Sequence, residues 1–194
     1  MKLLVTGGAG FIGSCFVRHV LKKHPDYKII NLDALTYCGN LENLDDLKNN
    51  PNHTFVKGNI CDRKLAQELI REVDCVINFA AESHVDNSIK HPEIFIETNV
   101  QGTLNLLQVS KELGVDRYLQ VSTDEVYGTL GKTGYFYETT PLAPNSPYSA
   151  SKAEYGVFLL ICVSVFPFHA VGMASPYHAG WSSFSCVWTA LILR

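Results

Sequence analysis

The chain has 194 residues, of which 46% are hydrophobic, and this length and composition suit one domain with a substantial core. Its formal net charge of −3 excludes the basic excess that is typical of general nucleic-acid binding. The six cysteines are scattered without a Cys-x-x-Cys pair, which favours reduced thiols over a disulfide framework or a zinc site. No secretory signal precedes the first strand-like segment, so we expect a cytoplasmic protein. We expect no metal site, because His84 and His91 have no further His or Cys at a suitable spacing.

Short apolar runs alternate with amphipathic segments as far as residue 153. Strands are predicted over 2–6, 28–32, 54–56, 75–79 and 117–121, and helices over 11–23, 62–72 and 92–113. Pro92 suits a first helical turn, and Gly114 stands where a helix C-cap glycine is expected. This β-α-β alternation predicts an α/β fold with a Rossmann-like, doubly wound parallel sheet, which binds ligands at the carboxyl ends of its strands.

A glycine-rich turn lies between the first predicted strand and the first predicted helix. Gly7 and Gly10 permit a tight turn and a close approach of the backbone to a pyrophosphate, and Gly13 permits close packing of helix on strand. The helix N-terminus, at Phe11 and Ile12, presents free N–H groups to the anion. The turn therefore predicts a dinucleotide site, with an ordinary glycine turn as the alternative.

Asp33 ends the second predicted strand, 20 residues beyond Gly13. Its carboxylate can accept hydrogen bonds from a ribose diol and would repel a 2′-phosphate, so the pattern predicts NAD rather than NADP. After the fourth predicted strand, the small side chains of Ala80 and Ala81 would leave room for a cofactor. Close packing of a helix on the sheet is the alternative interpretation of these two alanines.

A Thr-Asp-Glu triplet at Thr123, Asp124 and Glu125 is followed by Tyr148 and Lys152 at helical i,i+4 spacing. An ammonium beside a phenol favours the phenolate, a base that can take a proton from a sugar hydroxyl. Two adjacent carboxyls can act as acid and base if their environments separate their pKa values. The alternatives are a helix N-cap with acidic first-turn residues and a chance Tyr-x-x-x-Lys pair.

Together these motifs resemble the extended short-chain dehydrogenase/reductases, and within them the dTDP-glucose 4,6-dehydratase family. The resemblance covers residues 1–153 and rests on segments 6–13, 33–40, 80–86, 98–103, 122–128 and 148–152. The Thr-Asp-Glu triplet is the segment that singles out the dehydratase branch, because related epimerases usually carry small or hydroxyl residues there.

The resemblance implies NAD-dependent dehydration of a nucleotide-activated hexose, dTDP-glucose to its 4-keto-6-deoxy product, with hydride leaving C4 and returning to C6. Tyr148 would take the proton of the C4 hydroxyl, and Lys152 would lower the pKa of Tyr148 and bond the nicotinamide ribose. Thr123 would orient the C4 oxygen. Glu125 would then remove the C5 proton, and Asp124 would protonate the departing C6 hydroxyl.

The resemblance also implies cofactor contacts at the carboxyl edge of the sheet. The cofactor-binding residues would be Gly7, Gly10, Phe11, Ile12, Gly13, Asp33, Ala34, Leu35, Thr36, Asn59, Ile60, Ala80, Ala81, Ser83, Thr98, Tyr148 and Lys152. Ser83 and Thr123 would also contact the nucleotide-sugar substrate. Asn59 replaces an acid of the family but can still bond the adenine amino group, whereas Asn87, which replaces a basic residue, is left out of the site.

From residue 154 the sequence changes character, and 156–193 contain no charged side chain. The apolar run over 157–166 is shorter than the roughly 20 residues of a membrane helix, so a buried or misfitted tail is favoured over a membrane anchor. We expect an NAD-binding domain over 1–153 and a divergent apolar tail over 154–194, truncated relative to the family and lacking its C-terminal substrate domain. The chain would then bind NAD with little dehydratase activity by itself.

Two other functions remain open at this point. One is a related sugar-nucleotide epimerase or decarboxylase, against which Asp124 and Glu125 argue. The other is a catalytically impaired NAD-binding fragment that acts by pairing with other chains, for instance as a homodimer.

Overall fold

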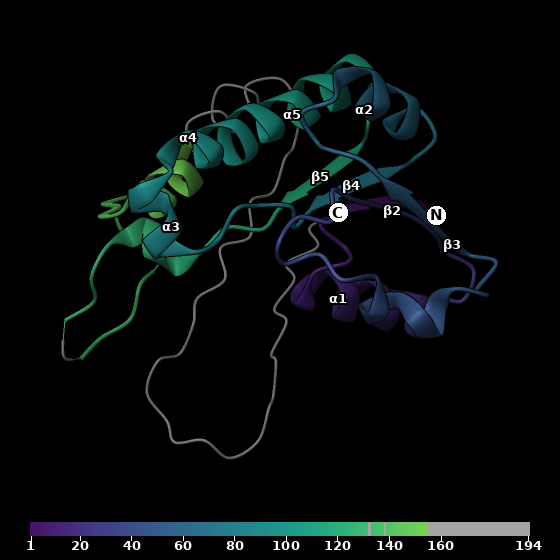
Figure 1. Cartoon of the computed structure of the whole chain (residues 1–194), viewed down its shortest axis with the longest axis horizontal. Helices are drawn as coiled ribbons and strands as arrows, with labels where there is room; N and C mark the ends of the chain where they lie inside the picture. The colour runs from purple at the N-terminus through teal and green to yellow at the C-terminus, as the bar shows by residue number, and fades with distance from the viewer. Residues whose placement is uncertain (132, 138, 155–194) are drawn as a thin grey trace.

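The computed structural model describes residues 1–131, 133–137 and 139–154, which form an α/β fold around one sheet (Figure 1). The sheet consists of the strands β1 (Lys2–Thr6), β2 (Lys28–Asp33), β3 (His53–Lys57), β4 (Cys75–Asn78) and β5 (Arg117–Gln120). Their order is β3-β2-β1-β4-β5, and every pair is parallel. This order confirms the predicted Rossmann-like sheet, because the chain winds outward from β1 in both directions.

The central strand β1 ends at the switch point of the sheet. Its last residue, Thr6, pairs with Leu32 of β2 on one side and with Asn78 of β4 on the other. The loops that follow these three strands therefore open at one edge. Ligands of doubly wound sheets bind at this edge, next to the strand where the order reverses.

Helices cover both faces of the sheet (Figure 1). On one face lies α1 (Phe11–Lys23), accompanied by the 3₁₀ helix η1 (Leu41–Leu47); on the other lie α2 (Arg63–Ile70) and α5 (Thr103–Glu112). The predicted helix over 62–72 is thus α2, which begins after its N-cap Asp62.

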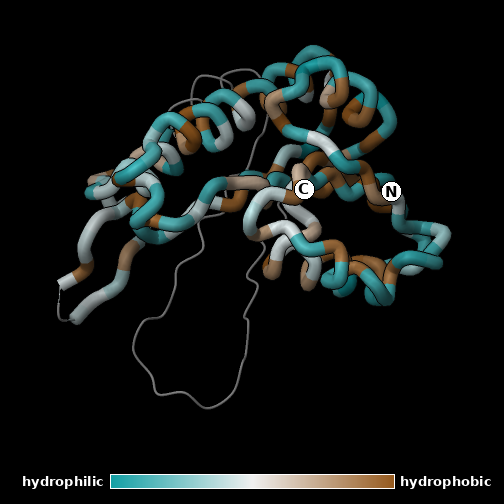
Figure 2. Tube along the Cα trace, viewed as in Figure 1, coloured by the Kyte–Doolittle hydropathy of each residue, from teal (hydrophilic) through white to brown (hydrophobic). Residues whose placement is uncertain are grey.

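Each face of the sheet has its own hydrophobic core. Along β1, Leu3 and Val5 contribute to the core under α1, while Leu4 contributes to the core under α2 and α5. This alternation follows from the two-residue period of a strand. Because helices cover both faces of the sheet, the consecutive residues Leu3, Leu4 and Val5 are all apolar. Figure 2 shows hydrophobic and hydrophilic positions alternating along the helices, as expected when each helix buries one side.

The long helix predicted over 92–113 is present as three consecutive helical segments. They are α4 (Pro92–Phe95), the π-helical segment η2 (Ile96–Gly102) and α5. Pro92 occupies the first turn, and Gly114 follows with a φ of +69°, as the C-cap prediction required. A short helix before them, α3 (Val85–Lys90), was not predicted.

The described part of the chain ends in a helical segment over 147–154. The predicted domain boundary at 153 falls one residue before the end of the described part, and the predicted apolar tail over 154–194, apart from its first residue, lies outside the described residues. Within 1–131, 133–137 and 139–154, no helix has the length and apolar character to cross a membrane. The same residues contain no cluster of side chains that could hold a metal ion.

Candidate functional site

The glycine turn connects β1 to α1 at the switch point of the sheet. Gly7 has a φ of +70°, and its N–H donates to the carbonyl of Leu32 at 2.9 Å. A Cβ on Gly7 would lie 2.6 Å from the backbone nitrogen of Ala80, so the loop after β4 packs directly against the turn. A Cβ on Gly13 would lie 2.2 Å from the carbonyl oxygen of Gly7. Only glycine fits at these two positions, as the motif predicted.

Asp33 joins the end of β2 to the glycine turn. Its Oδ2 accepts a hydrogen bond from the N–H of Ala9 at 2.9 Å, and its Oδ1 accepts one from the N–H of Leu35 at 2.8 Å. The side chain is buried, at 8% exposure. A carboxylate can accept further hydrogen bonds at both oxygens, so Asp33 can still bind a ribose diol from this position.

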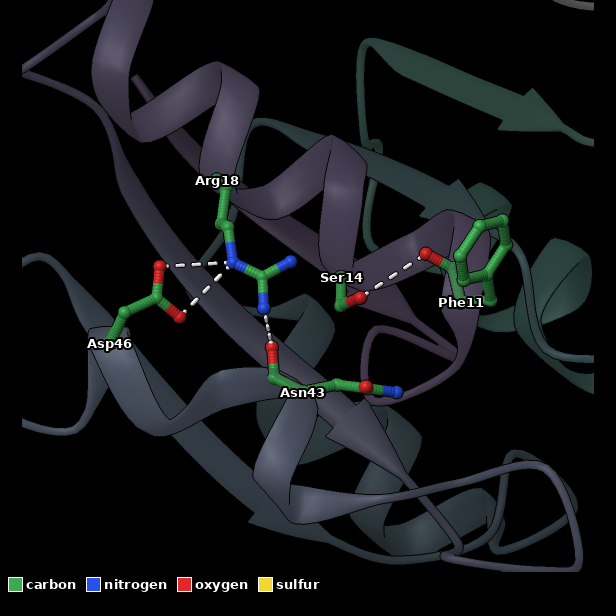
Figure 3. A network of polar contacts seen from close by, with 5 residues as sticks. All are labelled: Phe11, Ser14, Arg18, Asn43 and Asp46. Carbon is green, nitrogen blue, oxygen red and sulfur yellow. Dashed lines mark hydrogen bonds and ion pairs between the residues drawn. The ribbon is translucent and has the colours of Figure 1, made fainter. Parts of the chain in front are cut away.

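A second set of contacts holds the turn and α1 from the side of η1; Figure 3 shows those that Arg18 of α1 makes with Asn43 and Asp46. The Ala9 carbonyl accepts hydrogen bonds from the side chain of Asn43 at 2.9 Å and from the N–H of Asn40 at 3.1 Å. The Arg18 guanidinium on α1 bonds the Asn43 carbonyl and both carboxylate oxygens of Asp46. The turn is therefore fixed by β2 through Asp33 and by η1 through Asn43.

The predicted cofactor residues outside the glycine turn and Asp33 differ in exposure and in their contacts. Phe11 and Ile12 are exposed at the N-terminus of α1, at 78% and 43%. Ile60 is buried in the core under α2, and Asn59 uses its side-chain oxygen to cap the N–H of Cys61 at 2.9 Å. Thr98 is half-buried in η2.

Ala34 and Thr36 lie in the loop after Asp33, together with Leu35, which has a φ of +55°. Ala80 and Ala81 are half-buried after β4, and Ser83 is exposed two residues further along. Ala80 donates its N–H to Asn78 at 3.1 Å, so the backbone here turns away from the strand end.

The Thr-Asp-Glu triplet begins the 3₁₀ helix η3 (Asp124–Tyr127) after β5. Thr123 is its N-cap and accepts from the N–H of Glu125 at 3.4 Å, so this part of the N-cap alternative is also correct. Burial, and secondarily the charge of Asp124, raise the pKa of Glu125. A carboxylate with a raised pKa is a stronger base, which fits the role that the resemblance implies for Glu125.

Tyr148 lies against this triplet and is buried, at 9% exposure. Burial raises the pKa of its phenol; a hydrogen bond with Thr123 lowers it, and the charges of Glu125 and Asp124 raise it. The net direction is opposite to the lowering expected from Lys152, because desolvation of the phenolate is the largest effect. The triplet and the phenol nevertheless converge at one place.

Lys152 follows Tyr148 one helical turn later and is buried, at 4% exposure. Its ammonium donates to the carbonyl of Val121 at 2.9 Å, and burial lowers its pKa to about 8. The same carbonyl accepts from the Gln120 side chain at 3.2 Å, and Gln120 in turn accepts from Asn78 of β4 at 2.9 Å. A buried polar network thus connects Lys152 to the end of β4.

Two residues of the site were missed by the sequence interpretation. Asn99 in η2 is fully buried and bonds the backbone of Glu82 at 2.8 and 3.0 Å. It also donates to Ser151, at 2.9 Å, in the helix of Tyr148. Tyr37, in the loop after β2, contacts Ser83 after β4. The one sequence signal that could have indicated Asn99 was a polar residue within the predicted amphipathic helix over 92–113.

Known proteins are similar to this chain in sequence. The chain matches the family described as GDP-mannose 4,6 dehydratase over residues 4–171. It is 56% identical over 161 residues to the dTDP-glucose 4,6-dehydratase of Xanthomonas campestris pv. campestris (strain B100), an alignment that covers 77% of this chain and 45% of the relative.

Solved structures of similar proteins have a similar fold. The dTDP-glucose 4,6-dehydratase DesIV from Streptomyces venezuelae, with NAD and TYD bound, superimposes with a TM-score of 0.84 and 47% identity over 89% of this chain and 55% of that chain. The UDP-Glc/GlcNAc 4-epimerase from Campylobacter jejuni gives a TM-score of 0.80 and 31% identity, over 88% and 52% of the two chains.

The chain spans about half the length of the curated relatives and solved structures that it matches. The family match includes both the glycine turn and the Tyr148–Lys152 pair, and it extends beyond residue 153. The chain belongs to the family described as GDP-mannose 4,6 dehydratase, and it resembles the dTDP-glucose 4,6-dehydratases that its motifs indicated.

Proposed function

We propose that this chain carries the NAD site and the acid–base groups of a dehydratase that acts on a nucleotide-activated hexose. The observation that carries the proposal is the convergence of the Tyr148 phenol with Thr123, Asp124 and Glu125 at the carboxyl edge of the sheet. The glycine turn opens at the same edge. The chain's similarity to dTDP-glucose 4,6-dehydratases supports dTDP-glucose as the substrate.

The residues at the glycine turn fit a dinucleotide. Gly7 and Gly13 leave no room for a side chain, and α1 carries no acidic residue in its first turn that would repel a pyrophosphate. Asp33 would hold the adenosine ribose, and its charge disfavours a 2′-phosphate. When bound, NAD supplies a hydride acceptor for C4 of the sugar and later a hydride donor for C6.

The side chains of the chain would move the protons. Tyr148, oriented by Thr123, takes the proton from the C4 hydroxyl. A ketone at C4 acidifies the C5 proton, which Glu125 removes; its raised pKa makes it a stronger base than an ordinary glutamate. Asp124 donates a proton to the C6 hydroxyl as it leaves as water.

The carboxyl pair favours dehydration over epimerisation, although 4-epimerases share the fold. Epimerisation at C4 needs a base for the C4 hydroxyl but no acid and base for elimination across C5 and C6.

The proposal also includes location and assembly. The cysteines of the described residues, Cys15, Cys38, Cys61 and Cys75, are free thiols, which supports a cytoplasmic protein. Exposed isoleucines on neighbouring helical segments, Ile89, Ile94 and Ile96, support pairing of two copies.

The test uses the purified full chain with NAD and dTDP-glucose. We expect NADH to bind more tightly than NADPH, and any product formed to be lighter than the substrate by one water. Asp33→Ala should abolish the preference for NADH, while Tyr148→Phe should remove any turnover. Equal binding of NADH and NADPH would contradict the cofactor assignment, and an isomeric product of unchanged mass would contradict dehydration.

A further inference from the structure

Tyr37 extends from the loop after β2 to the loop after β4. Its phenolic oxygen accepts a hydrogen bond from the N–H of Ser83 at 3.2 Å and lies 3.4 Å from the Ser83 hydroxyl. Its ring is tilted against the ring of His84, with centroids 5.1 Å apart. Three contacts thus join two loops that are 46 residues apart in the sequence.

This contact crosses the glycine turn. In the sheet, β1 lies between β2 and β4, so a side chain that joins the loops after β2 and β4 must pass the carboxyl end of β1. The residue after Tyr37, Cys38, places its carbonyl oxygen 4.0 Å from the position of a Cβ on Gly10. Tyr37 therefore starts beside the N-terminus of α1 and ends at Ser83.

Electrostatic interactions also connect Tyr37 with Glu82 and with Tyr148. Its side chain bonds Glu82, whose pKa is raised mainly by burial, and a charge on Tyr37 would raise the pKa of Tyr148. Burial raises the pKa of Tyr37 itself, so at neutral pH the phenol is a neutral group that can both donate and accept.

We propose that Tyr37 is a positioning residue that closes over the middle of the bound dinucleotide by bonding Ser83, so that NAD enters and leaves only when this contact opens. The inference rests on the NAD binding proposed above. The dinucleotide would extend from Asp33 past Gly10 toward Tyr148, a path that runs beneath the Tyr37–Ser83 contact. The contact joins the two loops across this path, so it restricts entry as well as release.

The experiment measures NADH association and dissociation with the full chain by stopped-flow fluorescence, using excess NAD to displace NADH. Tyr37→Phe keeps the ring on His84 and removes the hydroxyl. Loss of these hydrogen bonds should accelerate NADH release by about tenfold. Association should also accelerate, by about twofold or more, because the closed state no longer delays entry.

Adenosine monophosphate is the matched ligand control, because it would occupy the region near Asp33 without passing beneath the contact. Its affinity for Tyr37→Phe should stay within about twofold of its affinity for the wild type. The melting temperature of the variant should equal that of the wild type within error. Tyr27→Phe is the matched protein control: Tyr27 stacks on His24 at the far end of α1, and its variant should leave both NADH rates unchanged.

Four results would overturn the inference. Unchanged NADH rates in Tyr37→Phe would show that the contact does not restrict exchange. Faster release with unchanged association, or an equal loss of affinity for NADH and adenosine monophosphate, would show an ordinary contact or a distorted loop. A wild-type chain that binds no NADH would overturn the cofactor proposal and this inference together, which distinguishes it from the other results.

Discussion

The side chain of Asn99 donates a hydrogen bond to the hydroxyl of Ser151 at 2.9 Å and thereby ties the π-helical segment η2 to the helix of Tyr148. The same amide group bonds the N–H and the carbonyl of Glu82 after β4. π-Helical turns occur often at functional sites, where the wider turn directs a side chain inward. Asn99 therefore connects the cofactor edge with the catalytic helix.

Replacing Asn99 with Ala should destabilise the chain by about 1–3 kcal/mol, because the buried N–H of Glu82 loses its partner and the Ser151 hydroxyl loses the hydrogen bond that it accepts from Asn99. Urea denaturation of the full chain measures this change. Asn87→Ala, at an exposed position of α3, is the control and should change stability by less than about 0.5 kcal/mol. Equal stabilities of the two variants would contradict the structural role of Asn99.

Gly13 and Gly131 provide a matched pair of glycines. A Cβ on Gly13 would lie 2.2 Å from the Gly7 carbonyl, whereas a Cβ on Gly131 would meet nothing within 4 Å. Gly13→Ala should therefore cost about 1–3 kcal/mol of stability and weaken NADH binding, because helix and turn must separate. Gly131→Ala should change neither quantity. Isothermal titration with NADH and thermal unfolding of both variants check the expectation, and tight NADH binding by Gly13→Ala would contradict it.

Local signals in the sequence predicted much of this edge of the sheet. The bounds of β1 and α1 agree with the prediction to the residue, because an apolar strand, a glycine turn and an amphipathic helix follow one another without ambiguity. Asp33 was placed at the end of β2 because its spacing from the glycines is fixed by the β-α-β unit. These features depend only on residues close together in the sequence.

Features that depend on contacts distant in sequence could not be predicted. Tyr37 and Ser83 follow strands that lie on either side of β1, so their contact depends on the sheet order. Neither residue belongs to a periodic pattern of apolar residues that would predict the contact. The π-helical segment lies within an apolar pattern that also suits a continuous α-helix, so its position depends on the bonds of Asn99. The direction of the Tyr148 pKa shift likewise depends on burial, which the Tyr-x-x-x-Lys spacing does not specify.

The carboxyl pair offers a test by titration. The Asp124 charge is the second cause of the raised pKa of Glu125, after burial. Asp124→Asn removes that charge and should lower the pKa of Glu125 toward its ordinary value without restoring it fully. Carboxyl ¹³C NMR of glutamate-labelled chain measures the shift. Glu82, whose pKa is raised mainly by burial, is the internal control and should titrate unchanged. A Glu125 pKa that stays constant in Asp124→Asn would show that the two carboxyls act independently.

Lys152 makes the stability of the chain depend on alkaline pH. Burial lowers the pKa of its ammonium from 10.5 to about 8, so between these values the unfolded chain holds a proton that the folded chain has released. The folded state is therefore favoured as the pH rises through this window, by at most about 1.4 kcal/mol per pH unit for one proton.

The difference in free energy of unfolding between the wild type and Lys152→Met isolates this effect from that of other groups, such as Tyr148. Urea denaturation at several pH values from 7.5 to 9.5 should show the wild type gaining stability relative to Lys152→Met. The exposed Lys22→Met should show no such trend relative to the wild type, and a flat difference for Lys152→Met would mean that the ammonium keeps its ordinary pKa when buried.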